Sequence, residues 1–382
     1  MPKALIITAE ATSINIQARL LASLLVKHGF SVSIYRQSEV AEANRYSALM
    51  MPNYIIYFYD PSLYPIIPSS LRYDHIIFYW TVDGVPASPT QRSRVKSMCN
   101  MGINITNSEY SKANLEAIGC HVLDIIHNGI DWFNLSKHIN DQVKYTFGVN
   151  AWYNYGGNLW YMDRKGYPAL IGILHKLWAR GLRFTAWIHS SHELLDFIGS
   201  RFNVTKLLSH VKSIYGILTI SQQNYDSGCF FAINKEPDEK RPIKYTNVGS
   251  LMDIGEFYGS IRYYLMNSYV EGFGVPPIEA LASGRFIIAN DIPTWRELRQ
   301  KYGLDSCSIS IPIHATKQYM WGVGDNKLLM TFNIPDFYTW LNVLEDAVTR
   351  GINYDPVKCS ELAKQLDYNN TYSQFLKYIN IK

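Results

Sequence analysis

The sequence lacks the motifs and the runs that define several large protein classes. It has five cysteines: Cys99, Cys120, Cys229, Cys307 and Cys359. No two of them form a C-x-x-C pair, which argues against a zinc site and a disulfide framework and favours a reducing compartment. No apolar run approaches the ~18 residues that span a bilayer, and Glu10 cuts off the first run too early for a signal peptide. Neither G-x-G-x-x-G nor G-x-x-x-x-G-K-[ST] occurs, which disfavours dinucleotide-binding and P-loop proteins.

Charge is scarce as well. Charged residues make up 18% of the chain and apolar residues 47%, a composition that excludes a disordered protein. Residues 1–135 hold 10 Lys/Arg against 10 Asp/Glu, and the remainder holds 26 against 22. We therefore expect no nucleic-acid partner, and a cytoplasmic protein for which peripheral membrane contact stays open. The 382 residues correspond to two domains of about 150–200 residues.

Apolar runs alternate with helical patterns along most of the chain. Strands are predicted at 3–8, 31–35, 53–59, 75–80 and 103–106, with helices at 16–28 and 110–118. After a polar, mixed segment at 132–145 the pattern restarts. Strands are predicted at 144–149, 183–190, 243–248, 262–268 and 286–290, helices at 167–181 and 356–379, and helical runs with a polar loop (234–242) within 191–240. This alternation predicts two Rossmann-like halves, each with a parallel sheet covered by helices.

The segment 261–297 carries the clearest functional signal. A buried-type strand ends in the loop EGFGV, two prolines follow, and a helix is predicted at 277–283, before Gly284 and a second strand. Ligands of open α/β sheets bind at this carboxyl edge of the strands. Glycines allow close backbone approach, and the free N–H groups of a helix start suit a diphosphate.

Two carboxylates flank this loop. Glu271 precedes it and Glu279 lies in the first turns of the helix, so both can accept hydrogen bonds from sugar or ribose hydroxyls. The alternative is that Glu271 is a solvated loop residue and Glu279 a partner of the helix dipole.

The stretch EGFGVPPIEALASG resembles the E-x7-E signature of retaining glycosyltransferases of family 4, which have the GT-B fold. Asn267-Ser268 before it, and Asp291-Ile-Pro with Glu297 after it, are similar to the family as well. The resemblance implies that Glu271 lies against the donor sugar and that Glu279 binds the ribose. It also implies donor contacts from the loop residues Gly272, Phe273, Gly274 and Val275.

Three further segments are similar to the family. Asp163-Arg164-Lys165-Gly166 resembles its R-K-G segment, which implies that Lys165 neutralises the leaving diphosphate with Arg164 as a helper. The alternative is a solvated basic pair at a helix start. Residues 106–119 and 125–131 resemble the end of the N-terminal domain and are expected to be architectural. The last helix fits a chain that crosses back onto its first domain.

The sequence departs from the family at two phosphate-binding places. The first β–α loop, AEATSIN (9–15), has no glycine, so close backbone approach is not expected there and Ser13 or Asn15 is the candidate donor. The second place is Gly148: the family has a phosphate-binding Arg directly after this glycine, and this sequence has Val149 there. The aromatic, glycine-rich insert 150–162 takes its place, and it is interpreted as a lid or acceptor platform, or alternatively as an oligomer contact or packed loop.

The acceptor side is less well marked. Asp83, in FYWTVDGVP after a strand, is the candidate that orients the acceptor hydroxyl or the sugar; the alternative is a turn aspartate before Gly84. His75, His127 and His189 are weaker candidates.

The resemblance to family 4 implies a GT-B enzyme of hexosyltransferase type. Its expected domains are 1–135 plus 356–382 on the acceptor side and 141–355 on the donor side, with a central cleft. The resemblance implies a UDP- or GDP-sugar donor, a glycan, lipid or protein-linked acceptor, and no metal or other cofactor. The alternatives are a nucleotide-sugar epimerase and a non-catalytic nucleotide-sugar-binding protein.

Overall fold

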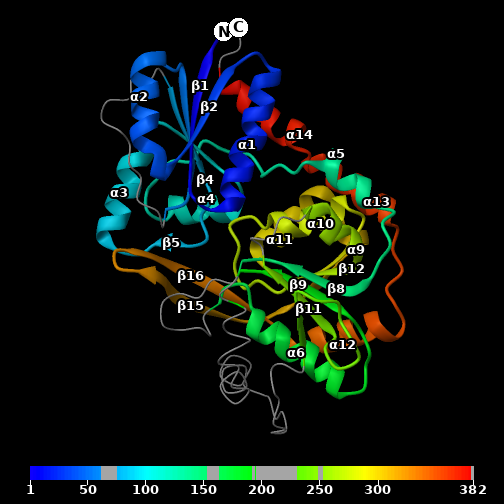
Figure 1. The fold of residues 1–382 in the computed structure, drawn as a ribbon. Coiled ribbons are helices and arrows are strands. Elements are labelled where there is room, and N and C mark those ends of the chain that lie inside the picture. The colour runs from blue at the N-terminus through cyan, green and yellow to red at the C-terminus, as the bar shows by residue number, and fades with distance from the viewer. Residues whose placement is uncertain (62–74, 153–162, 192–193, 195–229, 248–252, 380–382) are drawn as a thin grey trace.

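Two parallel sheets, one above the other in Figure 1, form the body of the protein. The computed structural model describes residues 1–61, 75–152, 163–191, 194, 230–247 and 253–379. Strands from the first third of the chain make the upper sheet, and strands from the remainder make the lower one. The predicted α/β class with two Rossmann-like halves is therefore confirmed.

The first sheet has six strands, all paired in parallel. In spatial order they are β2 (Ser31–Arg36), β1 (Lys3–Thr8), β3 (Tyr54–Tyr59), β4 (His75–Trp80), β6 (Ile103–Thr106) and β7 (Asp124–Ile125). Its helices are α1 (Thr12–Lys27), α2 (Val40–Met50), α3 (Pro89–Cys99) and α4 (Glu109–Glu116). The apolar runs β3 and β4 are buried almost throughout, because separate hydrophobic clusters cover the two faces.

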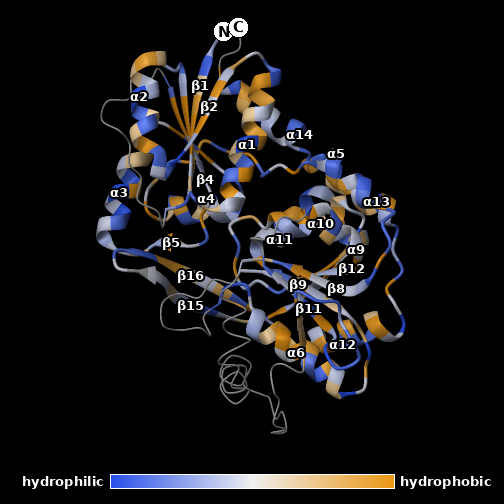
Figure 2. Ribbon diagram, in the orientation of Figure 1, coloured by the Kyte–Doolittle hydropathy of each residue, from blue (hydrophilic) through white to orange (hydrophobic). Residues whose placement is uncertain are grey.

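The second sheet has seven parallel strands. Their order is β10 (Phe231–Ile233), β11 (Ile243–Asn247), β9 (Ala186–Ser190), β8 (Tyr145–Asn150), β12 (Ile261–Met266), β13 (Phe286–Asn290) and β14 (Ser308–Ile311). Its helices are α6 (Tyr167–Ala179), α9 (Ile254–Ser260), α10 (Val275–Ala282), α11 (Pro293–Tyr302) and α12 (Phe337–Thr349). Figure 2 shows strands of both sheets in hydrophobic colours and hydrophilic colours on much of the outer helix surface. None of the described helices is both long and apolar enough to cross a bilayer.

Two helix starts differ from the prediction. α1 begins at Thr12 instead of residue 16, and α10 begins at Val275 instead of residue 277. The α10 error has a simple cause: both Pro276 and Pro277 fit within the first turn, where a helix needs no N–H donor. Helical runs are predicted within 191–240, and residues 192–193 and 195–229 of that region lie outside the described residues, as does most of the aromatic insert (153–162).

The end of the chain crosses back to the first sheet. After the short α5 (Trp132–Leu135) and the second sheet, α13 (Pro356–Ala363) packs against α10, and α14 (Tyr368–Tyr372) then lies on α1. The Tyr372 hydroxyl donates to the Gln17 side chain of α1, and Lys27 Nζ donates to the Tyr368 hydroxyl at 2.7 Å. The predicted crossing is confirmed, although it consists of short helices and turns instead of one helix.

A hairpin absent from the prediction joins the two halves. β15 (Ile313–Val323) and β16 (Asn326–Pro335) pair antiparallel, and β16 also pairs with β5 (Val85–Pro86) of the first half. The resulting three-stranded sheet closes the left side of Figure 1, opposite α5 and α13.

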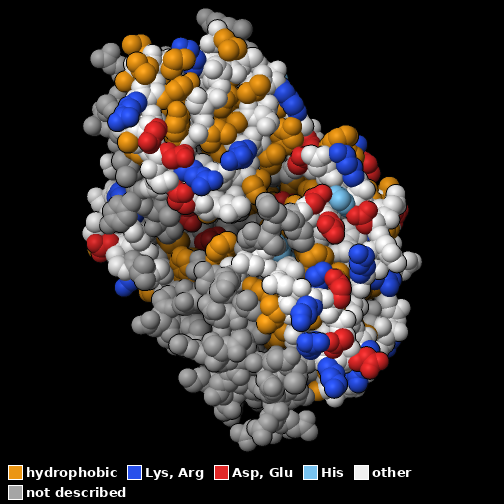
Figure 3. Space-filling model, in the orientation of Figure 1, with side chains coloured by type: hydrophobic (Ala, Val, Ile, Leu, Met, Phe, Trp, Pro, Cys, Tyr) orange, Lys and Arg blue, Asp and Glu red, His pale blue; other side chains and the backbone are white. Residues whose placement is uncertain are grey.

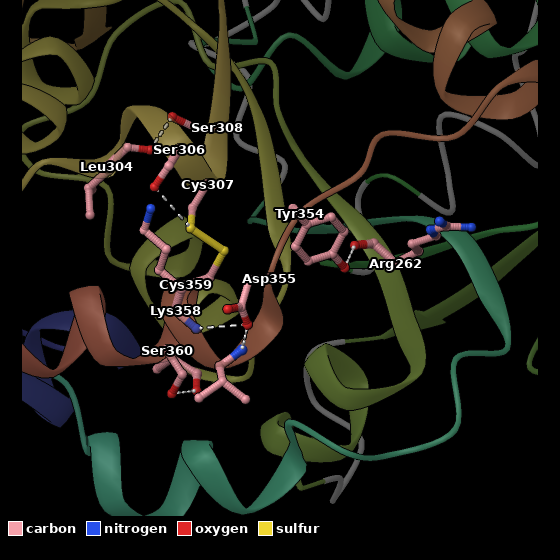
Figure 4. The surroundings of a disulfide bond; sticks show 12 residues. Arg262, Leu304, Ser306, Cys307, Ser308, Tyr354, Asp355, Lys358, Cys359 and Ser360 are labelled. Atoms are coloured by element: carbon pink, nitrogen blue, oxygen red, sulfur yellow. Dashed lines mark hydrogen bonds between the residues drawn. A yellow bond between two sulfur atoms is a disulfide. The ribbon is translucent and has the colours of Figure 1, made fainter.

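The expectation of unpaired cysteines is wrong. Cys99 bonds to Cys120 across 21 residues, with a Cα–Cα distance of 5.6 Å. Cys307 bonds to Cys359 across 52 residues, with a Cα–Cα distance of 5.5 Å, and Figure 4 shows this second bond. The pairing depends on strand order and helix docking, which spacing in the sequence does not show. The argument for a reducing compartment rested on unpaired cysteines and therefore loses its basis.

Candidate active site

Loops from the two sheets meet at the carboxyl ends of their strands. The segment after β4 carries Asp83, and the segment after β12 carries Glu271 and Gly272. The Gly272 N–H donates to Asp83 Oδ1 at 2.5 Å, and the Gly272 carbonyl accepts from Ser108 Oγ at 2.5 Å. Figure 3 shows the surface hollowed between the two lobes, with cationic and anionic side chains interspersed on the right of the lower one. The two loops that the sequence predicted to line the cleft are therefore in direct contact.

Four charged side chains form a chain of ion pairs across this contact. Arg164 lies between Asp83 (Nη2–Oδ2, 3.0 Å) and Glu271 (Nη1–Oε2, 3.1 Å). Lys165 Nζ donates to the other oxygen of Glu271. Each of these side chains is only 9–17% exposed, so solvent screens the pairs weakly. The structure thus brings together three predicted catalytic residues and the predicted helper, from both halves of the chain.

The Glu271 carboxylate is held ionised. Burial alone would raise its pKa, but Lys165 and then Arg164 outweigh burial and lower the pKa to about 2. Burial and the nearby Arg164 guanidinium lower the pKa of Lys165. Glu271 can therefore accept hydrogen bonds from hydroxyls at neutral pH but cannot supply a proton as a general acid.

This low pKa predicts how acid acts on stability. A carboxyl whose folded pKa is about 2, below its unfolded value of 4.5, adds stability that is present above pH 4.5 and lost as pH falls toward 2. Urea midpoints measured from pH 6 to pH 3 should therefore fall more steeply for the wild type than for Glu271→Gln. Parallel curves would contradict the ion-pair chain.

The glycine loop leads into α10 through a left-handed residue. Gly274, with φ of 91°, precedes the helix, and its own position supplies no capping side chain. The Gly272 N–H is occupied by Asp83, which the sequence did not indicate. The next three N–H groups, those of Phe273, Gly274 and Val275, have no hydrogen-bond partner in the part of the chain that the structure describes. They are the available backbone donors of this loop.

Glu279 lies one turn along α10 and is partly buried. Its carboxylate accepts from the Tyr258 hydroxyl at 2.7 Å, and that hydroxyl accepts from the Asn150 amide at 3.0 Å. Burial raises the pKa of Glu279 and the Tyr258 hydrogen bond opposes it. Glu279 therefore adjoins the end of β8, and sequence reasoning missed both Tyr258 and Asn150. Their types alone carry no signal, since only the sheet order brings them beside α10.

The remaining candidates lie apart from this chain of ion pairs. Ser13 is exposed in the first turn of α1, and His75 is exposed at the amino end of β4, the edge away from the cleft. His189 is buried at the end of β9 against Thr246 (2.8 Å), and burial lowers its pKa to about 4. Neither histidine has a described contact with Lys165 or Glu271.

His127 has a structural place between the halves. Its ring contacts the Tyr302 hydroxyl (2.7 Å) and Glu297 Oε1 (2.8 Å), and it packs against Phe273 with ring centroids 5.4 Å apart. Glu297 also accepts from the Glu109 N–H, at 3.0 Å, at the start of α4. The Phe273 side chain is therefore buried in an inter-lobe contact, which leaves only its backbone for a ligand.

Comparison with known proteins agrees with this architecture. No family model matches the chain. A protein of Sulfolobus islandicus rod-shaped virus 1, named an uncharacterized glycosyltransferase, is 23% identical over 384 residues, which cover 98% of this chain and 100% of the viral one.

Solved structures superpose over nearly the full length. HepE of Anabaena, in complex with UDP and glucose, has a TM-score of 0.58 at 13% identity, covering 99% of both chains. Sucrose-phosphate synthase from Thermosynechococcus elongatus has a TM-score of 0.61 at 12% identity, covering 99% of this chain and 98% of that one. The trehalose-6-phosphate synthase OtsA has a TM-score of 0.57 at 11% identity, covering 100% and 99%. The fold is therefore GT-B, as the sequence predicted.

Proposed function

We propose that this protein is a retaining glycosyltransferase that moves a sugar from a nucleoside-diphosphate sugar to an acceptor hydroxyl. The observation that carries the proposal is the cluster of Lys165, Glu271 and three N–H groups without a partner among the described residues, at the carboxyl edge of the second sheet and facing Asp83 of the first half. Cations and backbone donors suit a diphosphate, and ionised carboxylates suit sugar hydroxyls. The viral relative and the UDP and glucose in the HepE structure support the same chemistry.

In this scheme the bond from the anomeric carbon to the donor phosphate oxygen breaks, and a bond to the acceptor oxygen forms on the same face. The acceptor proton passes to the departing phosphate. Negative charge grows on the diphosphate, where Lys165 and the N–H groups of 273–275 stabilise it. We propose that Glu271 binds the donor-sugar hydroxyls and does not act as the nucleophile of a double displacement. The mechanism needs no metal.

Asp83 completes the acceptor side. Its Oδ1 and Oδ2 are engaged by the Gly272 N–H and Arg164, so its carboxylate is fixed at the junction of the two lobes. From there it orients the acceptor hydroxyl or the transferred sugar. A lipid, glycan or protein-linked acceptor fits this arrangement equally. On the donor side, we also propose Ser13 as a contact of the nucleotide sugar.

A thermal-shift panel of UDP, GDP, ADP and their sugar conjugates tests the proposal. One nucleotide should stabilise the protein, by about 2.7 kcal/mol at a concentration 100 times its Kd. Glu279→Ala should weaken that nucleotide by roughly 10-fold, since a hydrogen bond to a charged group is lost. Glu256→Ala, at an exposed position on the neighbouring α9, is the matched control and should bind as the wild type does.

Three results would contradict the proposal in different ways. If no nucleotide stabilises the protein, the proposal of a donor site is wrong. Conversion of the free nucleotide sugar without an acceptor would indicate an epimerase. Tight binding without hydrolysis or transfer across an acceptor panel would indicate a binding protein.

A further inference from the structure

The β15–β16 hairpin connects the second half of the chain to the loop that carries Asp83. It leaves the second sheet after β14, and β16 pairs with β5 through Leu328–Pro86 and Leu329–Val85. The Ala87 N–H donates to the Lys327 carbonyl at 2.8 Å. This ladder begins two residues after Asp83.

The turn of the hairpin, at the end farthest from the second sheet, forms hydrogen bonds with α3 and with Ser88, the residue before α3. Ser88 Oγ donates to the Asp325 carbonyl at 2.7 Å, and Arg94 Nη2 donates to Asn326 Oδ1 at 2.9 Å. In Figure 1 this contact lies on the left of the molecule, while the covalent links between the lobes run past α5 and α13 on the right. The hairpin therefore holds the lobes together on the side that the chain itself leaves unconnected.

The base of the hairpin supports the Glu271 loop. The Tyr269 carbonyl accepts from the Asn333 N–H at 2.9 Å and from its side-chain amide at 3.1 Å. Tyr269 and Val270 pack in a cluster whose other buried members are Leu328, Met330 and Phe332. The same strand thus fixes the segment that precedes Glu271 and the segment that follows Asp83.

Gly84 marks how closely β16 approaches the Asp83 loop. A Cβ at this position would lie 2.8 Å from the Leu329 carbonyl oxygen and 2.9 Å from Met330 Cγ. Asp83 is further fixed by the Tyr110 hydroxyl, which donates to its carbonyl at 3.2 Å. No larger residue fits at 84 without moving β5 away from β16.

We propose that the β15–β16 hairpin is a positioning element that docks on β5 and holds Asp83 against Arg164 and Gly272. This inference rests on the proposed function, in which Asp83 orients the acceptor or the sugar. It assigns to Leu329, which pairs with Val85, a role that acts through Asp83 and requires no contact with substrate. Donor binding, which depends on the second sheet, should not need the contact between β16 and β5.

Gly84→Ala tests this directly, because it wedges β5 from β16 beside an unchanged Asp83. Gly172→Ala is the matched control, since a Cβ there meets no atom of the described residues within 4 Å beyond its own helix backbone and chain neighbours. Hydrogen exchange should show the Gly272 amide, which donates to Asp83, exchanging faster in Gly84→Ala than in Gly172→Ala, with β13 amides unchanged. The kcat for transfer should fall roughly 10-fold or more, since small misplacements are costly, while donor Kd stays within about twofold.

A double-mutant cycle with Asp83→Asn separates an effect on the position of Asp83 from a general loss of structure. In an Asp83→Asn background, Gly84→Ala should lower kcat by no more than about twofold, because its effect runs through the same carboxylate. Equal losses in both backgrounds, or an unchanged Gly272 exchange rate, would overturn the proposal. If Gly84→Ala does not fold, the milder Ser88→Ala/Asn326→Ala pair is measured the same way. Failure of the whole function is distinct, since no nucleotide would then bind, and the exchange measurement still decides the hairpin's role.

Discussion

Lys165→Ala is expected to lower the rate of sugar transfer by about 10²–10³, the usual cost of removing one donor from a developing negative charge. Lys165 supplies the ammonium beside the Glu271 carboxylate, which directly precedes the glycine loop before α10. Because the charge on the diphosphate grows as the sugar leaves, the loss should fall on kcat more than on KM. Initial-rate kinetics with the donor identified by the thermal-shift panel measure both constants.

The substitution leaves Glu271 paired, which keeps the experiment interpretable. Arg164 still contacts Glu271 at 3.1 Å, so no buried carboxylate is orphaned and the variant should fold. Lys358→Ala, at an exposed position on α13, is the matched control and should turn over as the wild type does. Wild-type rates of both donor hydrolysis and transfer in Lys165→Ala would show that another group neutralises the leaving diphosphate.

We propose for Arg164 a role different from the one that the resemblance implied. Resemblance to family 4 implied a helper at the diphosphate, yet its guanidinium contacts Asp83, Glu271 and the Val270 carbonyl. An arginine with two carboxylate partners is a link between the lobes. We therefore propose that Lys165 carries the phosphate charge and that Arg164 holds Asp83 and Glu271 in register. Two carboxylates and two cations leave the chain of ion pairs neutral before a donor binds.

The sequence predicted what depends on local pattern. The buried strands β3, β4 and β13 follow from unbroken apolar runs, and the segment 271–279 follows from glycines, prolines and carboxylates at fixed offsets. These features need no knowledge of distant residues. The same is true of the alternation of strands and helices that implied two sheets.

What the sequence did not predict depends on contacts between distant residues. The Gly272 N–H is occupied by Asp83, 189 residues away, and Glu279 is paired with Tyr258 through the order of the second sheet. The hairpin β15–β16 has alternating polar and apolar residues, but the sequence does not show that β16 pairs with β5 of the first half. Cysteine pairing failed for the same reason, since only the fold brings widely spaced residues within bonding distance.

The Cys307–Cys359 bond gives the largest expected effect on stability. It joins the turn before β14 to α13, which also docks on α10 through Ser360 Oγ and the Ala282 carbonyl at 2.6 Å (Figure 4). Closing a loop of 52 residues in the unfolded chain is worth about 4 kcal/mol in the chain-entropy model. The Cys307→Ala/Cys359→Ala variant should therefore melt roughly 5 °C lower than the wild type, as measured by calorimetry.

The second bond supplies the control for this prediction. Cys99–Cys120 closes a loop of 21 residues, for which the same model gives about 3 kcal/mol, so its double alanine variant should lose less. Single Cys359→Ala should match the 307/359 double variant, since either change breaks the bond. In urea without reductant, no more than one of the five thiols should react with a thiol reagent. Five reactive thiols, or an unchanged melting temperature in all three variants, would mean that these cysteines are not bonded in the folded protein.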